Sequence, residues 1–139
     1  MYPEELVIPM REDLTEVGFQ ELRTPQDVDQ LLGSEQEGTT LVVVNSVCGC
    51  AAGAARPGVK WAVANSDKKP TILSTVFAGV DMEATAKVRE YCLPFPPSSP
   101  SIALFKDGEL VHFVERHHIE GRNAQMIGHH LIDVFAEFC

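Results

Sequence analysis

Residues 39–55 read TTLVVVNSVCGCAAGAA, and this stretch decides the fold. Thr40 to Asn45 is β-branched and apolar on both faces, as is typical of a central parallel strand. Ala51 to Ala55 is a run of small residues with which a helix can begin. A strand therefore delivers Cys48 and Cys50 to the N-terminus of a helix.

A cysteine at a helix N-terminus is reactive because unpaired amide groups and the helix dipole stabilise its thiolate. The dipole alone contributes about 0.3–1 kcal/mol, less than about one pKa unit, so local hydrogen bonds have to contribute as well. Arg56 and Lys60 lie farther along the helix and are expected to contribute less. We interpret the triplet Cys48-Gly49-Cys50 as a site of thiol–disulfide exchange.

The chain has 139 residues, enough for one domain whose core needs no disulfides. Its four cysteines are irregularly spaced and nothing at the N-terminus resembles a signal peptide, so we expect a reducing, cytoplasmic location. The net charge of -9 disfavours nucleic acid and anionic membranes as partners. No apolar run reaches the roughly 18 residues of a membrane span. Proteins or small molecules are the expected partners.

Residues 1–18 are interpreted as an N-terminal extension, in which Leu6, Met10, Leu14 and Val17 line one side of a helix. Residues 19–139 are expected to form a single α/β domain. Its strands are predicted at 19–22, 40–45, 71–78, 101–105 and 110–114, and its helices at 25–32, 51–65, 82–92 and 121–138.

Three local signals refine this prediction. Pro57 removes a backbone donor and is expected to kink the helix after the cysteines. Asp81 is expected to cap the helix that begins at Met82. Asp107-Gly108 predicts a tight hairpin, at which the sheet becomes antiparallel.

The order of these elements is that of the thioredoxin fold, a central mixed β-sheet with flanking helices. Pro100 opens the fourth strand and resembles the cis-proline of that fold, so we predict that the Ser99-Pro100 bond is cis. The backbone of Ser99 would then lie beside the thiols and offer hydrogen bonds to an incoming disulfide partner.

The segment from Asn45 to Gly53, followed by residues 55–57, resembles the signature of the bacilliredoxins. Further stretches resemble the same family, at residues 77–79, 83–87, 97–101, 115–117 and 119–122. Bacilliredoxins are thioredoxin-like proteins that remove bacillithiol from protein cysteines, and related proteins have been described as weak disulfide isomerases. The resemblance implies no bound cofactor, bacillithiol as thiol co-substrate, and S-bacillithiolated or disulfide-containing proteins as partners.

Carried onto this chain, the resemblance makes Cys48 the thiolate that takes bacillithiol from a modified protein. A second bacillithiol, or Cys50, then resolves the mixed disulfide on Cys48. A Cys-X-Cys bridge closes a ring of about 11 atoms, which favours isomerase or oxidant behaviour over general reduction. A general disulfide isomerase or oxidoreductase is therefore the alternative function.

The residues expected to bind substrate surround the triplet: Asn45, Ser46, Gly49, Arg56, Ser99 and Pro100. Asn45 and Ser46 either tie the loop together or contact the sugar and malate portions of bacillithiol. Arg56 either lies on a solvated helix face or pairs with a bacillithiol carboxylate.

Metal binding is the alternative of another class, with Cys48, Cys50 and a third ligand. No second paired motif supports it, so no metal site is assigned. The doublets His117-His118 and His129-His130 are each expected to place one ring at a shared site, because adjacent side chains point apart.

The remaining residues of chemical interest are expected to serve packing. Cys92 lies at a helix end and Trp61 in the helix after the triplet, both at positions typical of packing. Cys139 is terminal and expected to be mobile. The sequence leaves open whether the chain forms a homodimer.

Overall fold

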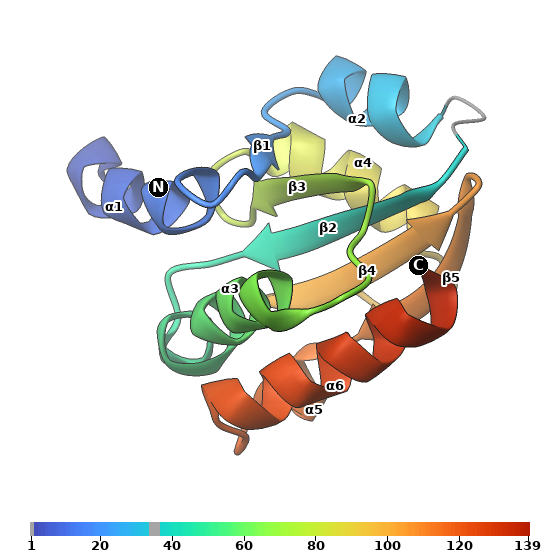
Figure 1. Cartoon of the computed structure of the whole chain (residues 1–139). Coiled ribbons are helices and arrows are strands. Elements are labelled where there is room, and N and C mark those ends of the chain that lie inside the picture. The colour runs from blue at the N-terminus through green and yellow to red at the C-terminus, as the bar shows by residue number, and fades with distance from the viewer. Residues whose placement is uncertain (1, 34–36) are drawn as a thin grey trace.

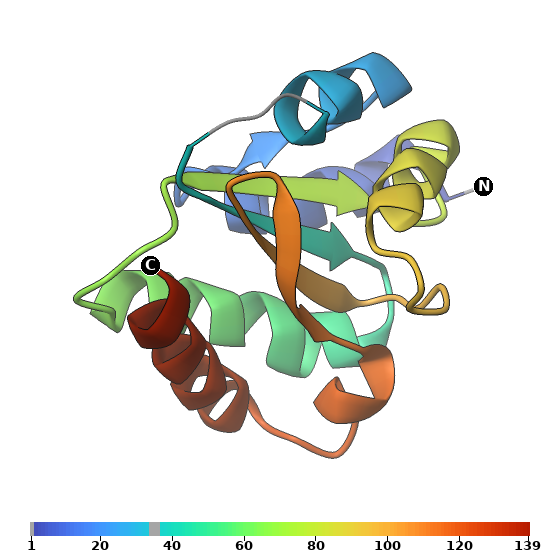
Figure 2. The same cartoon turned by 90° about the vertical axis from the view of Figure 1, so that its right-hand side faces the viewer.

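The computed structural model describes residues 2–33 and 37–139 as a sheet enclosed between two layers of helices (Figures 1 and 2). In chain order, the elements are α1 (Glu4–Thr15), β1 (Gln20–Glu21), α2 (Pro25–Leu32), β2 (Thr39–Asn45), the π-helical turn η1 (Ala51–Ala55), α3 (Arg56–Asn65), β3 (Ile72–Phe77), α4 (Met82–Tyr91), β4 (Ser101–Lys106), β5 (Glu109–Val114), α5 (Arg116–Ile119) and α6 (Ala124–Phe138).

The sheet is mixed and has the strand order β1-β3-β2-β4-β5. Strand β3 runs parallel to both β1 and β2, whereas β4 runs antiparallel to β2 and to β5. Every residue of β2 is buried, as the continuous apolar run predicts for a central strand. The predicted α/β class with a central mixed sheet is confirmed.

The side chains of β2 alternate between the two faces of the sheet. Leu41 and Val43 pack in the cluster that contains residues of α3 and α6, and Val42 and Val44 pack in the cluster with α2 and α4. Figure 1 shows these helix pairs on opposite sides of the sheet. The two-residue period of a strand thus supplies both halves of the core.

The hairpin between β4 and β5 turns at the predicted dipeptide. Asp107 and Gly108 both have positive φ, 51° and 84°, as a two-residue type I′ turn requires. The Oδ1 atom of Asp107 also accepts a hydrogen bond from Gly38 N at 2.8 Å, and its own N–H donates to Gly38 O at 2.9 Å. The turn is therefore tied to the start of the central strand.

The helix after the cysteines is irregular near Pro57, although not in the expected way. The irregularity is the π-helical turn η1, and Pro57 follows it within the first turn of α3, where its missing N–H costs least. Two glycines then let α3 approach α6 closely. A Cβ atom on Gly58 would lie 2.8 Å from Ile127, and one on Gly128 would lie 2.4 Å from Trp61.

Helix α1 packs on the domain through a face that shares Leu14 with the predicted one. Its buried residues are Val7, Arg11 and Leu14, whereas Leu6 and Val17 are 45% and 36% exposed. Leu14 joins the core cluster of α3 and α6. Residues 1–18, predicted as an extension, thus share a core with the domain predicted at 19–139.

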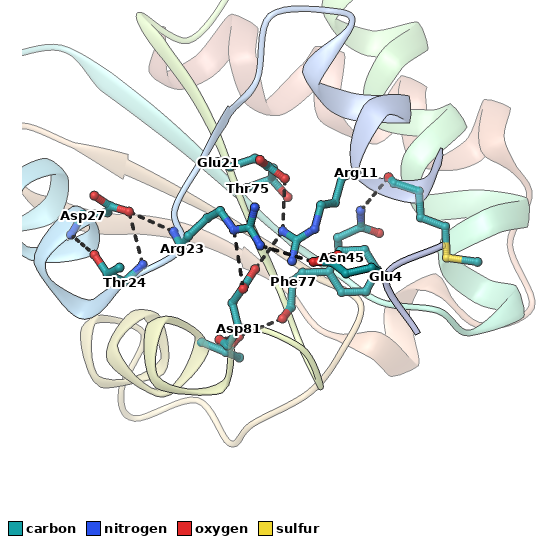
Figure 3. Close-up of polar contacts among 12 residues, drawn as sticks. Glu4, Arg11, Glu21, Arg23, Thr24, Asp27, Asn45, Thr75, Phe77 and Asp81 are labelled. Atoms are coloured by element: carbon teal, nitrogen blue, oxygen red, sulfur yellow. Dashed lines mark hydrogen bonds and ion pairs between the residues drawn. The ribbon is translucent and has the colours of Figure 1, made fainter. Parts of the chain in front are cut away.

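Arg11 lies on the inward side of α1 and faces two carboxylates (Figure 3). Its Nη1 atom lies 3.1 Å from Glu21 Oε1 and 2.8 Å from Asp81 Oδ2, and its guanidinium lies 5.3 Å from the centre of the Phe77 ring. Asp81 occupies the N-cap position of α4, as predicted, but its side chain makes no capping hydrogen bond. Its carboxylate faces Arg11 and Arg23 instead.

Two further features concern the end of the sheet that carries the cysteines. The Ser99-Pro100 peptide bond is cis, as predicted, and Leu93-Pro94 is cis as well. The short helix α5 was not predicted, since four residues are too few for a periodic pattern.

No helix among the described residues is long and apolar enough to cross a membrane.

Replacing Arg11 with alanine is expected to lower the free energy of unfolding by about 3–5 kcal/mol, because Asp81 would lose its buried partner. Urea unfolding measures the loss. The control is Arg23→Ala, which removes a half-exposed arginine 3.7 Å from the same carboxylate and should cost less than about 1 kcal/mol. Equal losses in both variants would contradict the role assigned to Arg11.

Candidate active site

The two cysteines of the triplet follow the C-terminal end of β2, where ligands commonly bind in open α/β sheets. A small pocket of about 220 Å³ lies there, with Cys48 in its wall. Its other lining residues include Ser46 from the same loop, Ser99 from the segment before β4, Arg89 from α4 and Arg116 from α5.

Cys48 is held by hydrogen bonds within its own loop. The Ser46 hydroxyl donates to Cys48 Sγ at 3.2 Å and lies 3.3 Å from Cys48 N, from which it accepts. The carbonyl of Cys48 accepts hydrogen bonds from Ala51 N at 3.1 Å and Ala52 N at 3.2 Å. These bonds fix the cysteine at the beginning of the helix, as the sequence predicts.

The surroundings of Cys48 favour its thiolate. Burial by itself raises the pKa of the thiol, but hydrogen bonds from the Ser46 hydroxyl and from the backbone of Ala51 and Cys50, together with the charge of Arg116, lower it below the ordinary value of 9.0. Local hydrogen bonds thus contribute most of the stabilisation, in agreement with the small energy expected from the dipole.

Arg116 is a site residue that sequence reasoning missed. Its charge acts on the Cys48 thiolate, its Nη1 donates to Ser99 O at 3.2 Å, and its Nε pairs with Glu120 at 2.6 Å. The directions of the strands would have allowed its position to be predicted. Because β5 is antiparallel to β4 and β4 to β2, β5 ends at the same edge of the sheet as β2, beside the cysteines.

The two cysteines of the triplet differ in their surroundings. Cys48 lines the pocket, whereas Cys50 is half-buried against the core cluster of α3 and α6. Both are free thiols. Gly49 between them is exposed, and a Cβ atom there would meet nothing within 4 Å. The tip of the loop therefore leaves room for a partner to approach the thiols.

Asn45 and Ser46 tie the loop together, which is one of the two predicted roles. Asn45 Oδ1 accepts from Ser46 N at 2.9 Å and from Arg56 Nη1 at 2.8 Å. Asn45, labelled in Figure 3, also donates through Nδ2 to Met10 O at 3.1 Å. Both side chains are buried. Contact of either residue with bacillithiol stays a prediction.

The expected solvated position of Arg56 is wrong, because the residue is only 4% exposed. Its Nη1 atom donates to both Asn45 Oδ1 and Ser46 O at 2.8 Å, and its Nε lies 3.2 Å from Asp13 Oδ2. The guanidinium therefore positions the loop from inside. The alternative role of Arg56, pairing with a carboxylate of bacillithiol, stays a prediction.

Ser99 and Pro100 lie beside the site. Ser99 lines the pocket with Cys48, and Pro100 is buried at the start of β4. The carbonyl of Ser99 already accepts a hydrogen bond from Arg116. Recognition of an extended partner by the Ser99 backbone remains a prediction.

The histidine doublets behave differently from one another. His129 packs against Trp61 and His130 approaches His112, so these two rings point apart as expected. The rings of His117 and His118, in contrast, lie with centroids 4.0 Å apart, because His118 Nδ1 turns back to accept from Glu115 N. The expectation for this doublet is wrong.

The metal alternative requires a third ligand near the cysteines. Within residues 2–33 and 37–139, the cluster of three potential ligands is Glu115, His117 and His118, with ligand atoms within 4.8 Å of one another. Neither Cys48 nor Cys50 belongs to it. Among the described residues, no third ligand therefore joins Cys48 and Cys50 in a metal site.

The other two cysteines lie away from the pocket. Cys92 is buried at the end of α4, and burial raises the pKa of its thiol to about 11, so it packs as an apolar residue as predicted. Cys139 is half-buried against the core cluster of α3 and α6. This packing differs from the mobile position expected for it.

Comparison with known proteins agrees with the geometry of the site. The model of the protein family described as "Disulphide isomerase" matches residues 2–139. A bacilliredoxin of Cytophaga hutchinsonii is 61% identical over 137 residues, which cover 99% of each chain. Bacilliredoxins of Halalkalibacterium halodurans and Salinibacter ruber are 56% and 52% identical over 138 residues, covering 99% of this chain and 94% and 81% of their own.

Replacing Ser46 with alanine is expected to slow the alkylation of Cys48 about 10-fold at neutral pH, because the thiolate would lose a charge-assisted hydrogen bond. The midpoint of the pH profile should move upward, toward that of an ordinary thiol. Mass spectrometry of the Cys48 peptide after iodoacetamide pulses measures both. The control, Ser66→Ala, removes a buried hydroxyl that donates to Ala62 O, and an unchanged profile in Ser46→Ala would contradict the assignment.

Replacing Arg56 with methionine is expected to lower the free energy of unfolding by about 3 kcal/mol or more, because it strips buried partners from Asn45, Ser46 and Asp13. Urea unfolding measures it. The control, Lys60→Met, removes a more exposed partner of the same Asp13 and should cost less than about 1 kcal/mol. A raised KM with unchanged stability would instead favour the substrate-binding role.

Proposed function

The chain belongs to the bacilliredoxin family and is a thiol–disulfide oxidoreductase, and from this premise we propose that it removes bacillithiol from S-bacillithiolated proteins. The observation that carries the proposal is the stabilised thiolate of Cys48 in the wall of a small pocket. Such a site accommodates a low-molecular-weight thiol and attacks the sulfur to which that thiol is joined.

In the first step, the Cys48 thiolate attacks the bacillithiol sulfur of the mixed disulfide. A Cys48–bacillithiol bond forms as the bond between bacillithiol and the protein breaks. The protein cysteine leaves as a thiolate and takes a proton from water. One disulfide replaces another, so this step needs no external oxidant or reductant.

In the second step, Cys50 attacks Cys48 and releases bacillithiol as a thiolate, leaving a Cys48–Cys50 disulfide. The thiolate of a second bacillithiol can instead attack the bacillithiol sulfur of the mixed disulfide, which forms bacillithiol disulfide and releases Cys48 as a thiolate. The environments of the two cysteines support these roles. Cys48 has the lowered pKa and lines the pocket, while Cys50 packs against the core cluster of α3 and α6.

General disulfide exchange or isomerisation is the second candidate function. The description of the matching family as "Disulphide isomerase" favours it, and so does the open space at Gly49, which leaves the thiols accessible to a folded partner. The two functions share the Cys48 nucleophile and differ in the group that it removes.

The test uses the Cys50→Ala variant, which keeps the nucleophile and removes the resolving thiol. Mixed with a protein carrying bacillithiol on a single cysteine, it is expected to gain the mass of one bacillithiol as the substrate loses it. Intact-mass spectrometry at neutral pH measures both changes.

The matched control is Cys48→Ala, which should gain no bacillithiol because none of the three remaining cysteines, Cys50, Cys92 and Cys139, is the nucleophile. Transfer to Cys48→Ala at the same rate would contradict the assigned roles. Failure of the Cys50→Ala variant to take bacillithiol, together with reaction on ordinary protein disulfides, would support general disulfide exchange instead.

A further inference from the structure

Two arginines from distant parts of the chain meet in the pocket beside Cys48. Arg89 comes from α4, on one side of the sheet end, and Arg116 comes from α5, after β5. No Asp or Glu lies among the described residues that line this pocket. In a chain with 20 acidic and 11 basic residues, the reactive thiol thus faces a locally positive wall.

Arg89 has no carboxylate partner within residues 2–33 and 37–139. Among the described residues, no Asp or Glu forms an ion pair with it, and its Nε atom is buried without a hydrogen-bond partner. A guanidinium stays charged at all relevant pH values and offers five N–H donors. A buried donor without an acceptor is costly, so Arg89 is suited to an anion that enters from outside.

Arg116 is anchored from two sides, by Glu120 at its Nε atom and by the Ser99 carbonyl at its Nη1 atom. These contacts hold the guanidinium near the Cys48 thiolate, on which its charge acts. Its other terminal nitrogen makes no hydrogen bond within the described part of the chain. One positioned guanidinium and one unpaired guanidinium therefore border the same small space.

The size of the pocket restricts what it can hold. Pockets for drug-sized ligands measure about 300–1,000 Å³. The pocket here, at about 220 Å³, is smaller, so it suits one acidic portion of a small thiol rather than a peptide segment. Two guanidinium groups match a group with two carboxylates, since one carboxylate can accept from the fork of Arg89 and the other from the remaining terminal nitrogen of Arg116.

We propose that Arg89 and Arg116 form a subsite for the carboxylates of an anionic low-molecular-weight thiol, with the thiol's sulfur at Cys48. This inference rests on the proposed function and names Arg89 as a residue that determines its specificity. A dicarboxylate held by the arginines places the sulfur of the small thiol, rather than that of the protein, next to Cys48. The protein cysteine is then the leaving group.

The test compares one carrier protein with a single cysteine bearing bacillithiol, mercaptosuccinate or 2-mercaptoethanol. Mercaptosuccinate keeps two carboxylates without the sugar, and 2-mercaptoethanol is neutral. The rate of mass gain on Cys48 is measured in the Cys50→Ala background, with and without Arg89→Gln. Each substrate is compared with itself, so differences in intrinsic thiol reactivity cancel.

Arg89→Gln is expected to slow transfer of bacillithiol and mercaptosuccinate about 10-fold or more and to leave transfer of 2-mercaptoethanol unchanged. Arg89 suits this test because it is not among the groups that lower the pKa of Cys48. Arg89→Lys should recover part of the loss, as a point charge without the planar fork. Arg122→Gln, which removes an exposed arginine outside the pocket, should react like the parent protein.

Equal slowing on all three substrates, or no slowing on any, would overturn the subsite. Alkylation of Cys48 by neutral iodoacetamide shows whether Arg89→Gln keeps a folded and reactive site, and Arg89→Lys provides the second variant if it does not. Bacillithiol transfer that is independent of Arg89 would keep the proposed function and reject the subsite. Mercaptosuccinate transfer that depends on Arg89, without any bacillithiol transfer, would keep the subsite and reject the proposed function.

Discussion

The amide of Asn45 joins three parts of the chain at the point where β2 ends. Its oxygen accepts from the Ser46 backbone and from Arg56 of α3, and its nitrogen donates to the carbonyl of Met10 in α1. A buried side chain of this kind is stable only when each donor and acceptor has a partner. The turn that carries the thiols, the helix behind them and the N-terminal helix are thus bound to one another.

This junction explains why the thiolate can be stabilised by short-range contacts. Arg56 lies close to the triplet in sequence, yet its charge is used on Asp13 and on the loop backbone, and it is not among the groups that lower the pKa of Cys48. The Ser46 hydroxyl, held in place by the same loop, acts directly on the sulfur. Geometry, rather than the number of nearby positive charges, therefore determines which group activates the cysteine.

Apolar periodicity and turn chemistry predicted the sheet, the hairpin at Asp107 and the position of Cys48, because each depends on a few adjacent residues. The sequence pattern failed where a charged side chain is buried. The apolar pattern of residues 1–18 assigned no role to Arg11, whereas its ion pairs with Glu21 and Asp81 place it on the packed face of α1. Arg116 was missed because its role comes from the ends of two strands meeting at one edge, which no local motif records.

The arginines near this end of the sheet divide into two groups by the fate of their charge. Arg11 and Arg56 are buried and pair with carboxylates of the chain. Their ion pairs stabilise the packing of α1 and the conformation of the loop that carries the thiols. In the pocket, Arg89 has no carboxylate partner among the described residues, and Arg116 pairs only with the exposed carboxylate of Glu120. With a net charge of -9, the protein as a whole repels an acidic thiol, but salt screens exposed charges beyond about 10 Å. Short-range contacts therefore determine whether an acidic thiol binds, and beside Cys48 these contacts are with the guanidinium groups of Arg89 and Arg116.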